Sequence, residues 1–258
     1  MSLSSWSSQS SPAMFPSPSK RLVKSNSGLR IVSQHERGNA PWALEEPHWV
    51  KDHEVTGCLT CPTQFDFLHR RHHCRRCGQI FCSKCCQSKI QFHRMGFVDP
   101  VRNCQTCSPL TRKEEIFFTN QLKVLFQGAP FHVRSSMAIS LDSCLYNCRI
   151  SNDERYLLFN NHGDEGEQIH PIDLCRISSI EILSEGNMML TAKEMTSSEF
   201  TLEIQAPAEP SRKPSLAWLK SFEQGMGFVF NSRESSLDQS PASSAESPQN
   251  SDVPPSDE

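Results

Sequence analysis

Four pairs of cysteines, each with the spacing CxxC, constrain this chain of 258 residues more than any other feature. They lie in one segment, where successive cysteines are separated by 2, 12, 2, 4, 2, 18 and 2 residues. The pairs are Cys58 with Cys61, Cys74 with Cys77, Cys82 with Cys85, and Cys104 with Cys107. A structural zinc ion takes four soft ligands in a tetrahedron, and two such pairs supply them. The spacing therefore predicts two zinc ions per chain, although counting alone does not decide which pairs share an ion.

Cysteine usage also indicates the redox compartment. Twelve cysteines are compatible with a secreted disulfide scaffold, but no apolar run follows Met1, and eight of the twelve have zinc spacing. We therefore expect a reducing, cytoplasmic environment. No stretch of the sequence approaches the roughly 18 apolar residues of a membrane-spanning helix, so we expect any membrane contact to be peripheral.

The most basic stretch, RRHHCRRCG at residues 70–78, combines four arginines and two histidines with two of the paired thiols. A guanidinium is a planar fork that holds phosphate oxygens through two hydrogen bonds. A run of arginines is usually a solvated surface, but here the metal ligands fix the backbone of the run. The stretch therefore predicts an anion-binding site. We expect no nucleic-acid partner, because the chain has no extended basic face and its pI is about 6.4.

Further motifs flank this segment: WxxD at residues 49–52, and Arg102 shortly before Cys104. With the cysteine spacing and RRHHCRRCG, they make the segment resemble the FYVE zinc-finger family, although that family usually has Val where Asn103 stands. The resemblance implies a two-zinc cross-brace and binding of phosphatidylinositol 3-phosphate. One zinc would be held by Cys58, Cys61, Cys82 and Cys85, and the other by Cys74, Cys77, Cys104 and Cys107.

The resemblance also assigns lipid contacts to individual residues. The implied headgroup contacts are Asp52, Arg70, Arg71, His72, His73, Arg75 and Arg102. Arginines would bind phosphate, whereas Asp52 and His73 would suit the inositol hydroxyls. Phe67 and Leu68, just before the basic stretch, would insert into the bilayer, and Phe65 is better placed as a core residue. We expect Cys86, and Cys144, Cys148 and Cys175 further along, to be small buried side chains rather than metal ligands.

The remainder of the chain divides by composition and periodicity. Thr111 and Glu114 match a helix capping box, alternation with a period of two begins after Pro130, and Pro214 is expected to open a last helix. The predicted fold is a small zinc-stabilised α+β finger followed by a mainly antiparallel β, pleckstrin-homology-like domain with a C-terminal helix. The expected parts are a disordered Ser-rich tail at 1–40, the finger at 41–110, a connecting helix at 111–128, the second domain at 129–230 and a disordered acidic Ser-rich tail at 231–258.

These features predict a non-enzymatic adaptor that binds phosphatidylinositol 3-phosphate on early endosome membranes. Resemblance across the whole chain to one branch of the family further implies a role in focal adhesion disassembly and cell migration, with focal adhesion kinase as a partner and focal adhesions or cytoplasmic vesicles as locations. The alternatives are a RING-like ubiquitin ligase, a zinc-dependent protein-interaction module without lipid binding, and an enzyme. RING sites normally include a histidine ligand, and no nucleophile with a base or phosphate loop stands out in residues 116–230, so we expect no catalysis and no small-molecule substrate.

Overall fold

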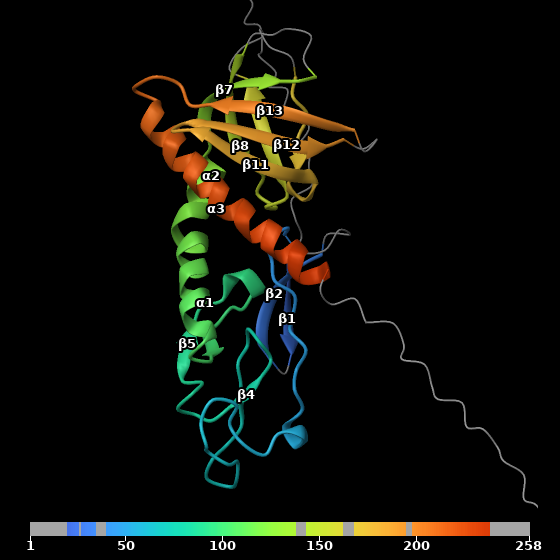
Figure 1. Ribbon diagram of the computed structural model, residues 1–258, viewed down its shortest axis with the longest axis vertical. Coiled ribbons are helices and arrows are strands. Elements are labelled where there is room, and N and C mark those ends of the chain that lie inside the picture. Colours follow the sequence, from blue (N-terminus) through green and yellow to red (C-terminus); the bar gives the residue numbers. More distant parts are fainter. Residues whose placement is uncertain are drawn as a thin grey trace, which may run out of the picture.

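The computed structural model describes residues 20–25, 27–34, 40–137, 143–161, 168–194 and 198–237. A finger with little regular structure lies at one end of the molecule and a large β-sheet at the other, with a helical column along one side (Figure 1). The finger contains two short hairpins and two 3-10 turns. Their bounds are β3 His72–His73, β4 Ile80–Phe81, β5 Ser88–Ile90, β6 Val101–Asn103, η1 Asp52–Glu54 and η2 His93–Met95.

A β-hairpin stands where the sequence predicts a disordered tail, so that prediction is wrong for β1 Lys20–Ser25 and β2 Gly28–Ser33. The hairpin gains its stability from the finger. The Ile31 N–H donates to the Gly96 carbonyl at 2.7 Å, and the Val98 N–H donates to the Leu29 carbonyl at 2.9 Å. Composition did not reveal this pairing, because the partner strand is about 65 residues further along the chain. Residues 1–19, 26 and 35–39 lie outside the described part.

The helical column begins earlier than the capping box predicts. It consists of α1 Cys107–Ile116, a π-helical segment Phe117–Gln121 and α2 Leu122–Gln127, and it ends as expected at Gly128, whose φ is +78°. Thr111 is fully buried inside α1, and its hydroxyl contacts Asn103 Oδ1 at 2.9 Å. The two capping-box residues therefore serve tertiary contacts, and the last zinc-spaced cysteine, Cys107, is the first residue of the helix.

The second domain is a seven-stranded antiparallel sheet with the order β10-β9-β8-β7-β13-β12-β11. The sequence predicted its alternating strands and its last helix. The helix, α3, starts two residues before Pro214 and extends into the predicted acidic tail; residues 238–258 are outside the described part. The bounds of the strands and helices in the second domain are β7 Ala129–Ser135, β8 Cys144–Ile150, β9 Tyr156–Asn161, β10 Ile172–Asp173, η4 Leu174–Arg176, β11 Ile177–Ser184, β12 Asn187–Lys193, β13 Glu199–Gln205 and α3 Arg212–Leu237.

The large apolar core lies between this sheet and α3. Trp218, Phe222 and Met226 on one face of the helix are all fully buried and pack with inward-facing strand residues such as Phe131. A strongly twisted antiparallel sheet whose open end is covered by a C-terminal helix is the architecture of a pleckstrin-homology-like domain. Of the cysteines expected in this core, Cys148 is buried and Cys144 partly so, whereas Cys175 is exposed. No helix among the described residues is long and apolar enough to cross a bilayer.

A buried ionic cluster joins the finger to the second domain. The Glu114 carboxylate on α1 accepts hydrogen bonds from Arg76 at 2.6 and 2.8 Å and from Arg94. Arg94 also donates to the backbone carbonyl of Phe228 at 3.0 Å and to the hydroxyl of Ser232 at 2.9 Å, both on α3. The C-terminal half of α3 therefore reaches the finger (Figure 1). This cluster fixes the orientation of the sheet relative to the finger.

We predict that Glu114→Ala lowers the free energy of unfolding by about 3–5 kcal/mol, because it leaves buried guanidinium groups without their carboxylate. Glu115→Ala is the matched control. Glu115 forms a single pair with His93, and the two side chains are 17% and 49% exposed; loss of this partly exposed pair should cost less, about 1 kcal/mol. Urea unfolding of both variants measures the difference. Equal losses would show that the cluster has no special role in stability.

Candidate metal and anion-binding site

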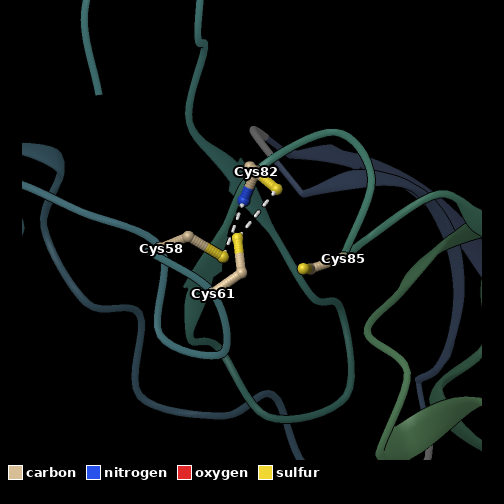
Figure 2. A group of neighbouring side chains, drawn as sticks. All are labelled: Cys58, Cys61, Cys82 and Cys85. Atoms are coloured by element: carbon tan, nitrogen blue, oxygen red, sulfur yellow. Dashed lines mark hydrogen bonds between the residues drawn. The ribbon is translucent and has the colours of Figure 1, made fainter. Parts of the chain in front are cut away.

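The first group of cysteines comes from two loops that are distant in the sequence. Cys58, Cys61, Cys82 and Cys85 converge so that their sulfur atoms all lie within 4.8 Å of one another (Figure 2). The Cys82 N–H donates to Cys58 Sγ at 3.3 Å, and Cys61 Sγ lies 3.7 Å from Cys82 Sγ. Tetrahedral bonds of about 2.3 Å to zinc place sulfur atoms roughly 3.8 Å apart. The group therefore fits a closed zinc site.

The second group consists of Cys74, Cys77, Cys104 and Cys107, whose sulfur atoms also lie within 4.8 Å of one another. The two groups interleave along the chain, which is the cross-brace that the resemblance implies. Cysteine binds a metal as the thiolate, and the positive charge of a bound ion favours that form. Four thiolates leave no open coordination position, so each ion would be structural.

Two residues near the second group depart from a simple ligand pattern. Cys86 is completely buried, belongs to neither group of four, and packs with the cysteines. Asn103 stands where the family usually has Val, and it is also completely buried. Its amide donates to the Val101 carbonyl at 3.0 Å, and its Oδ1 contacts the Thr111 hydroxyl at 2.9 Å. Both ends of the amide are therefore satisfied, which explains why a polar residue is tolerated there.

The basic stretch enters the finger along β3, and the predicted headgroup residues near it form one group. The Arg75 N–H donates to the Arg102 carbonyl at 2.9 Å. Burial lowers the pKa of His72, and the positive charges of Arg102 and Arg75 lower it further. These two guanidinium groups therefore lie close to His72. On the other strand face, His73 Nε2 is 2.7 Å from the Val50 carbonyl and 3.9 Å from Asp52 Oδ1.

The two arginines that precede β3 occupy different surroundings. Arg71 donates from Nε and Nη2 to the Val55 carbonyl, at 3.1 and 2.9 Å, and its guanidinium lies 5.0 Å from the Phe65 ring centre. Arg70 is exposed and lies 5.0 Å from the ring centre of Phe67. Arg70 is thus the basic residue of the stretch that stands beside the exposed loop, whereas Arg71 is held against the body of the finger.

The loop ahead of the basic stretch presents two apolar side chains to solvent. Phe67 is 81% exposed and Leu68 80%. Asp66 holds the loop in this shape, because its Oδ1 accepts the Leu68 N–H at 2.8 Å and the His69 N–H at 2.7 Å. Hydrogen bonds from the His69 backbone and side chain lower the pKa of Asp66, which keeps the carboxylate charged. Phe65 is partly buried against the cysteines, as expected for a core residue.

Two family models match consecutive parts of the chain. The model described as "FYVE zinc finger" matches residues 48–113, and the model described as "Zinc finger FYVE domain-containing protein 21 C-terminus" matches residues 116–234. A curated relative, phosphatidylinositol-3,5-bisphosphate 3-phosphatase MTMR4 of Xenopus laevis, is 43% identical over 63 residues, which is 24% of this chain and 6% of the relative. The likeness to that phosphatase is therefore confined to a segment the length of the finger.

Solved structures resemble each half separately. The LM5-1 FYVE domain of Leishmania major is 31% identical and covers 27% of this chain and 83% of its own, with a TM-score of 0.24. The PH domain from TgAPH is 11% identical and covers 45% of this chain and 92% of its own, with a TM-score of 0.32.

The two cysteine groups and the family match define the class of this part of the chain: residues 48–113 form a FYVE zinc finger. FYVE fingers bind two zinc ions, and as a family they bind phosphatidylinositol 3-phosphate membranes. The second half of the chain matches the C-terminal family of zinc finger FYVE domain-containing protein 21, and the whole chain is similar to that protein in its order of domains.

We predict that Cys74→Ser lowers the zinc content by one ion per chain and makes the finger sensitive to protease, because zinc binding and folding of the finger are coupled. Cys175→Ser is the control, since Cys175 is exposed on the second domain and outside both groups. Native mass spectrometry counts the ions, and limited proteolysis reports the fold. Retention of both ions by Cys74→Ser would contradict the predicted ligand set.

Proposed function

We propose that this protein is a non-enzymatic adaptor that binds phosphatidylinositol 3-phosphate on endosomal membranes. The observation that supports this most is the backbone hydrogen bond of 2.9 Å from Arg75 to the Arg102 carbonyl, which sets two basic residues side by side in the finger, with the exposed Phe67 and Leu68 on the same segment. Fixed cations bind a phosphate with little loss of conformational entropy. The apolar side chains of the loop add affinity only at a bilayer, because only a bilayer offers them an apolar phase.

Within this proposal, the residues have different tasks. The Arg75 and Arg102 guanidinium groups bind the 3-phosphate, and His72 donates a hydrogen bond to it from a ring N–H. His73 and Asp52 bind the inositol hydroxyls as acceptors: the Val50 carbonyl takes the Nε2–H of His73, which leaves Nδ1 of the neutral ring to accept, and the Asp52 carboxylate accepts as well. Arg70 is exposed beside Phe67 and meets phosphates at the membrane surface. Arg71 supports the strand through Val55 and contributes charge.

The alternatives are less well supported by the geometry. Each cysteine group is a closed set of four thiolates with no histidine ligand, which differs from a RING site. The similarity to a phosphatase extends over only 63 residues, which is 6% of that relative and about the length of the finger. The finer role in focal adhesion disassembly and cell migration, through focal adhesion kinase, stays a prediction, and co-purification of the kinase with the full chain is its first test.

The proposed lipid preference is tested with phosphatidylcholine vesicles that contain one phosphoinositide at a time. We expect the full chain to co-sediment with vesicles containing phosphatidylinositol 3-phosphate and to bind 4- and 5-phosphate isomers more weakly. Arg75→Ala should lose most of this binding, whereas Arg112→Ala, which removes the same charge from an exposed position on α1, should not. Equal binding to all anionic vesicles would contradict headgroup recognition and indicate a nonspecific charge effect.

We further predict that replacing Phe67 and Leu68 by Ala weakens vesicle binding at least about tenfold, because each large apolar side chain transferred from water contributes about 1.5–3 kcal/mol when fully buried. Affinity for a soluble short-chain phosphatidylinositol 3-phosphate should barely change. The control replaces Ile182 and Leu183, which are 44% and 46% exposed on β11 of the second domain. If soluble and vesicle affinities fall together, the loop belongs to the fold of the finger rather than to membrane insertion.

A further inference from the structure

The hairpin β1–β2 touches the headgroup site, although it lies outside the segment that matches the FYVE family. Arg75 Nε donates to the Ser27 carbonyl of the hairpin at 2.7 Å, and Arg75 Nη1 donates to the His73 carbonyl at 3.0 Å. Two of the three guanidinium nitrogens are thus fixed by backbone oxygens. Nη2 remains to bind a phosphate oxygen. The hairpin therefore determines which edge of this guanidinium faces the ligand.

A second route connects the hairpin to the same arginine. Arg30 Nη1 on β2 donates to Glu46 Oε2 at 2.7 Å, and Glu46 Oε1 accepts from Trp49 Nε1 at 3.1 Å. The Arg75 guanidinium carbon lies 5.4 Å from the centre of the Trp49 ring. The Trp49 and His73 rings meet edge to face, with their centres 5.5 Å apart. Glu46 thus holds the aromatic platform on which Arg75 rests.

The hairpin itself is firmly attached, so it is able to position other groups. Arg30 Nε donates to the Met95 carbonyl at 2.9 Å, and the guanidinium lies 5.4 Å from the centre of the Phe97 ring. Gly28 has φ +142°, and a Cβ there would stand 3.3 Å from the Phe97 ring. A close approach at a positive φ favours glycine. The turn of the hairpin is therefore seated on the finger at a defined distance from Arg75.

We propose that Glu46 and Arg30 are positioning residues for the headgroup site, and that they act by fixing Trp49 and Arg75 in the orientation that phosphate binding requires. This inference rests on the proposed function. It predicts the direction in which the affinity for phosphate changes when the charge of Glu46 is removed. Glu46 is an acid close to an anion site, so its charge alone would weaken phosphate binding. If Glu46 holds the platform, however, its removal weakens binding, because Arg75 and Trp49 then lose their preorganisation.

The experiment compares Glu46→Leu with Glu46→Gln in the full chain, on vesicles containing phosphatidylinositol 3-phosphate. Both variants remove the same charge, but Gln keeps one acceptor oxygen, which can accept from Trp49 or from Arg30, whereas Leu keeps none. We expect Glu46→Leu to bind about fivefold to tenfold more weakly than wild type, and Glu46→Gln to lose only about twofold to threefold. In an Arg75→Ala background, Glu46→Leu should have little further effect, because positioning acts through Arg75.

A second pair of variants tests the contacts that run from Arg30 on the hairpin through Glu46 and Trp49 to Arg75. Arg30→Gln should weaken binding, whereas Arg21→Gln, which removes the same charge from an exposed position on β1, should not. Zinc content and thermal unfolding verify that each variant is folded. The inference is overturned if Glu46→Leu binds at least as tightly as Glu46→Gln, or if its effect is undiminished in the Arg75→Ala background. Failure of wild type to prefer phosphatidylinositol 3-phosphate would instead overturn the proposed function.

Discussion

The coordination of two zinc ions by interleaved cysteine pairs is the constraint on which the rest of the structure depends. The finger contains few regular elements and only small clusters of buried apolar side chains, so its chain crossings must be fixed by ligands instead of a core. Cys74 and Cys77 belong to the same ligand group as Cys104 and Cys107. This pairing brings the basic strand β3 beside the strand that bears Arg102. The backbone N–H of Arg75 donates to the Arg102 carbonyl at 2.9 Å, so two basic residues that are distant in the sequence become neighbours.

The finger is continuous with the second domain, because the last cysteine of the metal groups, Cys107, is also the first residue of α1. The Glu114 carboxylate on this helix then binds two arginines of the finger, and one of them, Arg94, reaches α3. A buried charge network of this kind is stable only when every member keeps its partners. The pleckstrin-homology-like domain is therefore held in one orientation relative to the finger that carries the exposed Phe67 and Leu68.

The hairpin β1–β2 fixes the position of a side chain in the proposed ligand site, as the zinc ligands fix the backbone of the finger. A guanidinium on a flexible chain loses conformational entropy when it binds phosphate, and contacts made beforehand reduce that loss. Here the Ser27 carbonyl and the Trp49 ring hold Arg75 from two sides, and both depend on the hairpin. Sequence outside the family segment thus contributes to a site that the family motif defines.

The sequence by itself determined the metal sites and the chemistry of the finger, because cysteine spacing and RRHHCRRCG encode ligands and cations in short, local patterns. It also predicted the antiparallel domain and its last helix, since periods of two and 3.6 reflect burial on one face. Only the tertiary structure decided the contacts between distant segments. The hairpin at Lys20–Ser33 looked like a solvated tail because its partner, residues 96–98, is far along the chain. Thr111 and Glu114 read as a helix cap, yet folding places both in a buried network that supplies better partners than the helix end does. The contact of Glu46 with the hairpin also came only from the tertiary structure, because its carboxylate joins Trp49, three residues away, to Arg30 on β2.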